Sequence, residues 1–511
     1  MSRMIAYALA ATAVCAAVLS TATPLDDYVN RDDGHFSYVK LNHTVKGDGF
    51  TAEFYNMTSQ KWMTEAETNR PIWWHFMAVV IPDNIDNTVD SSFLYITGNS
   101  NSHPDDIPKV DDEDFIAVQL LAMAARCPGA VLWQVPNQPI TYVDDPWHAG
   151  GRTEDANIAI TWWYFMHNPS KPDYVLELPM TKSAVKAMDA LELIFPTLLG
   201  RNIGKFIVAG ASKRGWTTWL AGAVEAVAKN RVIAIIPIVL DAIHINDFLR
   251  RQFTFYGAWT FALKDYYNCN VTIDFQLPTA KTLWELIDPW YYRDRLTMPK
   301  LAINAGGDEF QMPDDQRFWG KDMPADMHFL LVKNAEHSMA TGLLELLPSA
   351  GAFAMSVQHN WTRPVVTWDI NEPNGAVTFN ADRAPATVDI TFCDSADGVS
   401  KGRRDFRWAA LNVSSCPVKV FGACVRPLLW ETLSGAQATP YLVQNNATSF
   451  TATMPMPDGA EAGKWRAFTM ELTFKTPDPS KDFLFTIPAS VIPNTAPFPM
   501  CSGEACHSAL C

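Results

Sequence analysis

The stretch that decides the fold reads Lys205-Phe206-Ile207-Val208-Ala209-Gly210-Ala211-Ser212-Lys213-Arg214-Gly215-Trp216. Its first half is apolar and β-branched, as in a buried strand, and a helical pattern follows the Gly-x-Ser tripeptide at once. A sharp strand-to-helix turn of this kind is a nucleophile elbow, which exposes a serine Oγ at the edge of a sheet. The sequence therefore predicts that Ser212 is a nucleophile and that the backbone N–H of Lys213 is one oxyanion donor.

An acid for the triad stands at the end of a later strand. Leu301 to Asn304 has the pattern of a strand, and a Gly-Gly turn follows it with Asp308 at its tip. Catalytic groups gather at the carboxyl ends of strands in open α/β sheets. We therefore expect Asp308 to orient the catalytic base, with Glu309 as the alternative acid. The competing interpretation is an aspartate that only orders its own turn.

His337 is the predicted base, because it lies on a loop just beyond the next strand. His328 falls inside that strand and His359 lies at a domain boundary, so neither is placed as well. The chain order Ser212, Asp308, His337 is that of the α/β-hydrolases. In such a triad the imidazole takes the serine proton and the carboxylate stabilises the imidazolium. A loop histidine that is merely solvated is the alternative.

The second oxyanion donor and the end of the elbow motif depart from the common pattern of these enzymes. A second donor is expected from Asn99, in a small polar loop after an early strand. The elbow also departs from the usual Gly-x-Ser-x-Gly, because Arg214 holds the last position and Gly215 follows it. A large side chain there would crowd the strand against the helix unless it points outward. Lys213 and Arg214 would supply positive charge to an oxyanion or a substrate carboxylate, or else be ordinary surface cations.

Strand-like and helix-like segments alternate up to about residue 360, as expected of a parallel α/β sheet covered on both faces. The alternation breaks at residues 241–299, an aromatic-rich stretch that we interpret as a cap or as packed surface helices. Short alternating segments at 363–490 predict an all-β sandwich. The expected order is a signal peptide at 1–22, an α/β-hydrolase domain at 23–360 that starts irregularly over 23–68, the β-sandwich domain, and a Pro- and Cys-rich tail at 491–511.

Composition argues against a nucleic-acid-binding protein, and the N-terminus indicates a secreted one. The chain has 511 residues, of which 48% are hydrophobic, and its formal net charge of −15 argues against a nucleic-acid partner. Arg3, the apolar run Met4 to Leu19 and the small residues before Thr23 predict a signal peptide cleaved after Ala22, with an uncleaved anchor as the alternative. We therefore expect a secreted protein with no membrane span in its mature chain.

Cysteines and glycosylation sequons agree with export. Of nine cysteines, Cys15 lies in the signal, and the remaining eight are expected in disulfides whose pairing is open. The tail cysteines Cys501, Cys506 and Cys511 are expected in disulfides rather than in a metal knuckle. N-glycosylation is expected at the six Asn-x-Ser/Thr sequons, which are Asn42, Asn56, Asn270, Asn360, Asn412 and Asn446.

The motifs resemble those of the PhoPQ-activated pathogenicity-related family, which includes secreted autocrine proliferation repressors of social amoebae. The resemblance rests on Gly210-Ala211-Ser212-Lys213-Arg214-Gly215-Trp216-Thr217, Gly307-Asp308-Glu309-Phe310 and Asn334-Ala335-Glu336-His337-Ser338, with Glu154-Asp155-Ala156 in support. It covers about residues 24 to 480 and implies an α/β-hydrolase domain followed by a β-domain. The Gly-x-Ser-x-x-Gly spacing is also similar to the elbow of glucuronoyl esterases, and is thus compatible with catalysis.

Two functions from different classes follow. The first is hydrolysis of an ester or peptide bond in a small-molecule or peptide substrate through an acyl-enzyme. No metal or organic cofactor is expected, because neither zinc-type His spacing nor a dinucleotide fingerprint is present. The second function, which the resemblance allows, is a secreted signalling ligand for a cell-surface receptor that keeps the fold without turnover. Carbohydrate binding by the tryptophan-rich surface and the β-domain is a third hypothesis.

Overall fold

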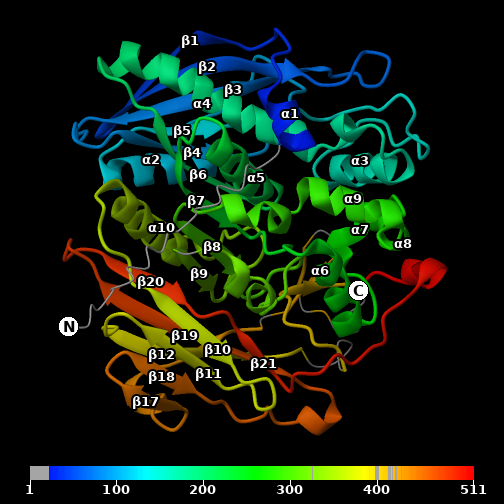
Figure 1. The fold of residues 1–511 in the computed structure, drawn as a ribbon, viewed down its shortest axis with the longest axis vertical. Helices are drawn as coiled ribbons and strands as arrows, with labels where there is room; N and C mark the ends of the chain where they lie inside the picture. Colours follow the sequence, from blue (N-terminus) through cyan, green and yellow to red (C-terminus); the bar gives the residue numbers. More distant parts are fainter. Residues whose placement is uncertain are drawn as a thin grey trace, which may run out of the picture.

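A computed structural model of the chain describes residues 22–324, 326–396, 402–411, 416, 418–420, 423–426 and 428–511. Residues 1–21 of the predicted signal peptide and the sequon residue Asn412 lie outside the described residues. Figure 1 shows a central sheet with helices on both faces and further β-structure beyond its last parallel strands.

Nine strands form the sheet around the elbow. They run in the order β1-β2-β3-β5-β4-β6-β7-β8-β9, and those from β5 to β9 are parallel. The strands are β1 (Ser37–Gly47), β2 (Phe50–Lys61), β3 (Ile72–Pro82), β4 (Ser91–Ile96), β5 (Gly129–Leu132), β6 (Lys205–Ala211), β7 (Val232–Ile238), β8 (Lys300–Ala305) and β9 (Met327–Val332). Because β4 lies between β5 and β6, the strand order reverses there, and ligands of open α/β sheets bind at such a switch point.

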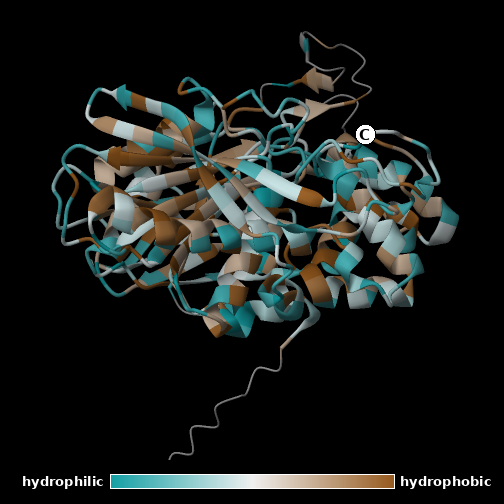
Figure 2. Cartoon of the chain, turned by 90° about the horizontal axis from the view of Figure 1, so that it is seen from above, coloured by the Kyte–Doolittle hydropathy of each residue, from teal (hydrophilic) through white to brown (hydrophobic). Residues whose placement is uncertain are grey.

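Helices cover both faces of the sheet because successive strand residues point to opposite sides. In β6, Phe206 and Val208 are buried in the same cluster as residues of α4 and α5, whereas Ile207 is buried with residues of α10. The packed helices are α1 (Pro24–Asn30), α2 (Glu113–Ala125), α4 (Glu177–Leu199), α5 (Lys213–Val227) and α10 (Leu343–Gln358). In Figure 2 hydrophobic residues are concentrated in the strands, and the surrounding loops are mostly hydrophilic.

Residues 23–68 are regular, so the prediction of irregular structure there is wrong. They form α1 and the antiparallel pair β1 and β2, joined by a tight turn in which Gly49 has φ 80°. Asp48-Gly49 is a strong hairpin signal by itself. The polar composition misleads because β1 is the edge strand of the sheet, with exposed and half-buried residues and no fully buried one.

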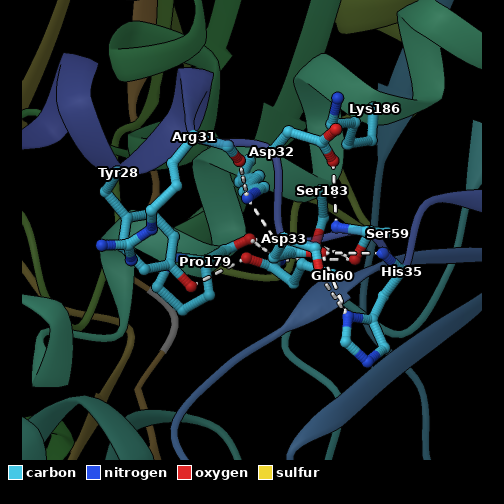
Figure 3. A network of polar contacts seen from close by, with 12 residues as sticks. Tyr28, Arg31, Asp32, Asp33, His35, Ser59, Gln60, Pro179, Ser183 and Lys186 are labelled. Atoms are coloured by element: carbon cyan, nitrogen blue, oxygen red, sulfur yellow. Dashed lines mark hydrogen bonds and ion pairs between the residues drawn. The ribbon is translucent and has the colours of Figure 1, made fainter.

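A buried polar network fixes the N-terminal segment to α4, as Figure 3 shows for Tyr28, Gln60 and Pro179. The Tyr28 hydroxyl donates to Gln60 Oε1 at 2.9 Å, and Gln60 Nε2 donates to the Pro179 carbonyl at 2.7 Å. The Lys182 ammonium, buried on α4, lies 2.7 Å from the Asp33 carboxylate. These contacts hold the hairpin against the helix that itself packs on α5.

Between β7 and β8, where the sequence predicts a cap or packed surface helices, lies a group of short helices that we call the cap. They are α6 (Ile245–Tyr256), α7 (Lys264–Asn268), α8 (Val271–Asp274) and α9 (Pro278–Ile287), and α3 (Asp155–His167) packs against the last three. The 3₁₀ helices of the described chain are η1 (Pro172–Tyr174), η2 (Phe261–Leu263), η3 (Pro289–Arg295), η4 (Asp315–Phe318), η5 (Gly320–Asp322), η7 (Gly435–Gln437), η8 (Ala460–Ala462) and η9 (Gly503–His507).

The C-terminal β-structure extends the main sheet. β20 pairs with β9 through Thr486 and Phe329, and β19, β12, β16 and β21 continue from there. A second sheet, β10-β11-β18-β17, shares one buried cluster with β19, so the predicted all-β sandwich is confirmed. The strands are β10 (Val366–Ile370), β11 (Val377–Ala381), β12 (Thr387–Asp394), β13 (Ala409–Ala410), β14 (Val418–Val420), β15 (Ala423–Val425), β16 (Glu431–Leu433), β17 (Leu442–Asn446), β18 (Ser449–Ala452), β19 (Arg466–Lys475), β20 (Asp482–Thr486) and β21 (Ser490–Ile492). The domain limits near residue 361 stay a prediction.

The tail folds back onto the cap. The fully buried indole of Trp259 donates to the Cys506 carbonyl at 2.6 Å, and Tyr267 stacks on His507 at 3.8 Å between ring centroids. A Cys501–Cys506 disulfide closes this segment. Cys511 is unpaired and buried against Arg407, so the expectation of a disulfide there is wrong.

Of the other cysteines, two form the expected disulfide and three do not. Cys416 and Cys424 form a second disulfide, as predicted from the even count. The expectation of disulfides at Cys127, Cys269 and Cys393 is wrong, because in the described structure these cysteines are buried thiols with no disulfide partner.

Candidate active site

The elbow holds Ser212 in a strained backbone conformation between β6 and α5. Ser212 has φ 57° and ψ −128°, and its N–H donates to the Ile238 carbonyl at 2.8 Å. A Cβ on Gly210 would lie 2.7 Å from the Arg214 carbonyl oxygen, and one on Gly215 would lie 2.9 Å from that of Ile238. Both glycines are therefore required for the helix to approach the strands, and strain of this kind is typical of a functional site.

The three predicted catalytic residues lie in one hydrogen-bonded row. His337 Nε2 is 2.9 Å from Ser212 Oγ, and His337 Nδ1 is 2.8 Å from Asp308 Oδ2. The Asp308 carboxylate is almost fully buried and accepts the backbone N–H groups of Phe310 at 2.6 Å and Gln311 at 2.9 Å. These donors fix the carboxylate, which in turn fixes the imidazole, so the nitrogen that faces the serine is free to accept a proton.

Electrostatics at His337 favour a base that is easily protonated. Burial alone would lower the pKa of His337, but the contacting Asp308 carboxylate outweighs burial and raises that pKa above 6.5. An opposite charge at hydrogen-bond distance stabilises the imidazolium that forms during attack.

Glu309 holds the histidine loop from the backbone side. Its Oε2 accepts the His337 backbone N–H at 3.1 Å, and it does not take the place of Asp308 at the ring. Burial, followed by repulsion from Asp308, raises the pKa of Glu309 to about 7. Glu309, the alternative acid in the sequence analysis, is thus a second titratable group next to the base His337.

Behind the serine lies a charged cluster that the sequence analysis did not anticipate. Lys213 Nζ is 2.8 Å from Glu154 and 3.1 Å from Asp155, and the Arg214 guanidinium contacts both Glu154 oxygens at 2.7 and 2.8 Å. Although burial opposes ionisation, the two cations hold the pKa of Glu154 far below its usual range. Arg214 therefore points away from the strand–helix contact into an ion pair, where Gly98 leaves space for it.

The loops of Asp308 and His337 are supported by Trp408 and Trp430. Trp408 N–H donates to the Gly307 carbonyl at 3.0 Å, and the Trp430 indole donates to the Gly306 carbonyl at 3.0 Å. Asn334, three residues before His337, accepts the Trp430 backbone N–H at 2.7 Å. A Cβ on Gly307 would lie 2.2 Å from the Trp408 indole, so only glycine fits there.

An apolar cavity opens at Ser212 and His337 and extends beneath the cap. Aromatic and aliphatic side chains from α3, α5, α6 and the cap helices make most of its wall. Asp155 and Lys213 stand at its polar edge, and the Tyr266 hydroxyl donates to Asp155 at 3.0 Å. A chamber of this kind, next to a nucleophile, can hold the apolar part of a substrate.

Of the two predicted oxyanion donors, Lys213 lies at the cavity and Asn99 does not. Lys213 opens α5 and lines the cavity, so its backbone N–H lies at the helix N-terminus beside Ser212. Asn99 follows β4 with φ 113°, and its side chain accepts the Ser100 N–H at 2.6 Å. Asn99 is not one of the described residues that line the cavity, and its role as a donor stays a prediction.

The described sequons are accessible. Asn42, Asn360 and Asn446 are exposed, and Asn56 and Asn270 are partly exposed. Within the described ranges, no helix is both long enough and apolar enough to cross a bilayer.

The strand order, the elbow and the Ser–His–Asp row define the class of the protein as an α/β-hydrolase fold. Within that class, the chain belongs to the PhoPQ-activated pathogenicity-related protein family, whose model matches residues 25–407. It is also 34% identical over 498 residues to autocrine proliferation repressor protein A of Dictyostelium discoideum, across 94% of this chain and 92% of that protein.

Two solved esterase-type structures are partly similar. Acetyl xylan esterase 1 from Thermoanaerobacterium sp. is 12% identical with a TM-score of 0.40, over 65% of this chain and 93% of that one. An S-formylglutathione hydrolase from Agrobacterium tumefaciens is 12% identical with a TM-score of 0.38, over 62% and 99% of the two chains. The assignment of the fold rests on the topology and the elbow described above.

Proposed function

We propose that the protein is a secreted serine hydrolase that cleaves an ester or peptide bond through an acyl-enzyme. The observation that supports this most strongly is the 2.9 Å distance from His337 Nε2 to Ser212 Oγ, with Asp308 on the far nitrogen. Serine is a weak nucleophile unless a neutral base takes its proton, and this row supplies that base.

In acylation, Ser212 Oγ attacks the carbonyl carbon while His337 Nε2 takes the hydroxyl proton. The carbonyl electrons move onto oxygen, and the Lys213 N–H stabilises the resulting oxyanion. When the oxyanion collapses, the bond to the leaving oxygen or nitrogen breaks, and that atom takes the proton from His337. The acyl group is then bonded to Ser212 and the histidine is neutral again.

In deacylation, water repeats the attack. His337 takes a proton from water as its oxygen bonds to the acyl carbon, and the bond to Ser212 Oγ then breaks. Ser212 recovers the proton from His337, and the free acid leaves. Neither half-reaction requires a metal or an organic cofactor.

The test is covalent labelling of the glycoprotein, made in a eukaryotic host, with a fluorophosphonate. Wild type should be labelled, and Ser212→Ala and His337→Ala should not be. Ser170→Ala, which changes an exposed serine, is the matched control and should be labelled like wild type. Absence of labelling in well-folded wild type would refute an activated serine.

A second candidate is a secreted signalling ligand, which the 94% coverage by an autocrine proliferation repressor protein favours. If the protein acts as a ligand, Ser212→Ala should inhibit the growth of responsive cells as strongly as wild type does. Loss of that inhibition in a folded Ser212→Ala protein would count against this candidate and for the enzyme.

Secretion and glycosylation are part of the proposal. They are supported by the N-terminal sequence, the two disulfides and the accessible sequons. N-terminal sequencing of protein from the medium should begin at Thr23, and treatment with an N-glycanase should lower its mass. A chain that stays in the cells with Met1 intact would contradict secretion.

A further inference from the structure

The cavity at Ser212 limits the substrates that the proposed hydrolase can accept. We infer that the acyl part of the substrate is an uncharged, apolar and short alkyl chain, seated between α5 and the cap. This inference rests on the proposed function, and it adds the chemical class of the group that becomes bonded to Ser212.

Most of the cavity wall that faces away from the triad is apolar, and Thr272 is its polar residue in the cap. Trp216 comes from α5, Trp162 from α3 and Phe248 from α6, and each is at most 4% exposed. Leu263 and Val271 close the cavity from the cap. A methylene moved from water into such a wall contributes about 0.8 kcal/mol, or about fourfold in an equilibrium or rate.

The size of the cavity sets the length of the chain. The space that the centre of a water-sized atom can occupy is about 60 Å³. A cavity of this size favours a short alkyl chain over a long one, and we expect the optimum at butyl or hexyl.

A charged acyl chain is disfavoured because the charged residues at the polar edge of the cavity are already paired with one another. Lys213 is the one permanent cation among the described residues that line the cavity, and it is already held by Glu154 and Asp155. Asp155 in turn accepts the Tyr266 hydroxyl. Thr272 Oγ1 and Gln311 Oε1 line the cavity without a hydrogen-bond partner among the described residues, but both are neutral. A carboxylate or an ammonium at the end of the acyl chain would thus be buried mainly among apolar side chains without a free opposite charge, which is strongly unfavourable.

The experiment uses a series of ethyl 4-nitrophenyl alkylphosphonates, which phosphonylate a serine and place the alkyl group where the acyl chain would lie. The second-order rate of Ser212 modification is followed by intact mass for methyl, butyl, hexyl and decyl members. The rate should rise about fourfold per methylene up to butyl or hexyl and fall for decyl. A hexyl chain that ends in a carboxylate or an ammonium should react at least about 100-fold more slowly.

Variants at Ala242 test whether the alkyl chain lies in this cavity. Ala242 lines the cavity, so Ala242→Val and Ala242→Leu should shorten the best chain stepwise, with Leu favouring the methyl member. The milder Val change keeps the test valid if Leu disturbs folding. Ala262→Leu makes the same exchange in the cap at a partly exposed residue outside the cavity lining, and it should keep the wild-type profile.

The outcomes separate the two proposals. Modification of Ser212 with a flat dependence on chain length, or with equal rates for charged chains, would overturn this inference and leave the hydrolase intact. Failure of every member, including methyl, to modify folded wild type would overturn the proposed function and this inference with it. An optimum at butyl or hexyl that shortens in the Ala242 variants but not in Ala262→Leu supports both.

Discussion

At the residue scale, His337 lies between two carboxyl groups that contact it in different ways. Asp308 binds the ring, and Glu309 binds the backbone N–H of the same residue. Burial opposes the imidazolium, but Asp308, and then Glu309, outweigh it and raise the pKa of His337. A general base acts only when neutral, so hydrolysis should be lost as the pH falls through this raised pKa.

Asp308→Asn should therefore change both the rate and its pH dependence. Removing the charge at the ring lowers the pKa of His337, so the acid limb of kcat/KM should move to lower pH. The rate at pH 8 should fall by about 10³–10⁴-fold, because an amide also favours the wrong tautomer. The pH profile of hydrolysis measures both effects, and a wild-type acid limb below pH 6.5 would contradict the assignment.

Glu309→Gln should separate the effect of the Glu309 charge from the effect of its hydrogen bond to His337. The amide oxygen can still accept the His337 N–H, but the negative charge beside the base is lost. We expect the acid limb to move to lower pH with less than about a tenfold loss of kcat/KM, a far smaller loss than for Asp308→Asn. An unshifted limb in the pH profile would show that the Glu309 charge does not influence the base.

At the element scale, the turn after β8 is built around two indole rings. A Cβ at residue 307 would overlap Trp408 at 2.2 Å, and one at residue 306 would overlap Trp430 at 2.5 Å. Gly307→Ala must therefore displace Trp408 or the turn that carries Asp308. We expect at least a tenfold loss of kcat and a lower melting temperature, measured by hydrolysis and by calorimetry.

Two further variants check this explanation. Trp408→Ala combined with Gly307→Ala should recover part of the lost stability, because the overlapping ring is gone. Gly351→Ala is the control, since its Cβ would meet Leu121 at 3.6 Å inside a helix, where alanine is the better residue. If Gly307→Ala behaves like Gly351→Ala, the turn does not depend on this contact.

The elements that carry the chemistry could be predicted because their signals are local. Strand, glycine, serine and helix follow one another at Ser212, and Asp308 and His337 each follow their own strand. Glu154, Trp408 and Trp430 act on those loops from distant parts of the chain, and no neighbouring residue marks them. Their roles depend on which segments pack together, which hydrophobic periodicity does not specify.

At the scale of the whole molecule, the sandwich and the hydrolase part share a sheet and a core. β20 pairs with β9, and one buried cluster joins residues of β8 and α10 with residues of β11 and β19. The pattern of strands predicts a sandwich, but it does not show that one of its sheets continues the parallel one. Pairing partners far apart in sequence leave no local signal.

This continuity makes the two parts one folding unit. A fragment of residues 23–360 would expose the edge of β9 and the apolar face that packs on the second sheet. We expect the fragment to aggregate or to lack near-ultraviolet circular dichroism and fluorophosphonate labelling, whereas residues 23–511 show both. A folded, labelled fragment would show that the sandwich is dispensable.

The packing of Trp408, Trp430 and Cys506 also sets the time at which the site is complete. A ribosome delivers Ser212, Asp308 and His337 before Trp408, Trp430 and Cys506, which support the acid turn, the histidine loop and the cap. Domains fold as their chain emerges, but this site lacks these supports until the residues that follow His337 have been translated. If the protein is the proposed hydrolase, a nascent chain that stops before Trp408 should therefore be inactive.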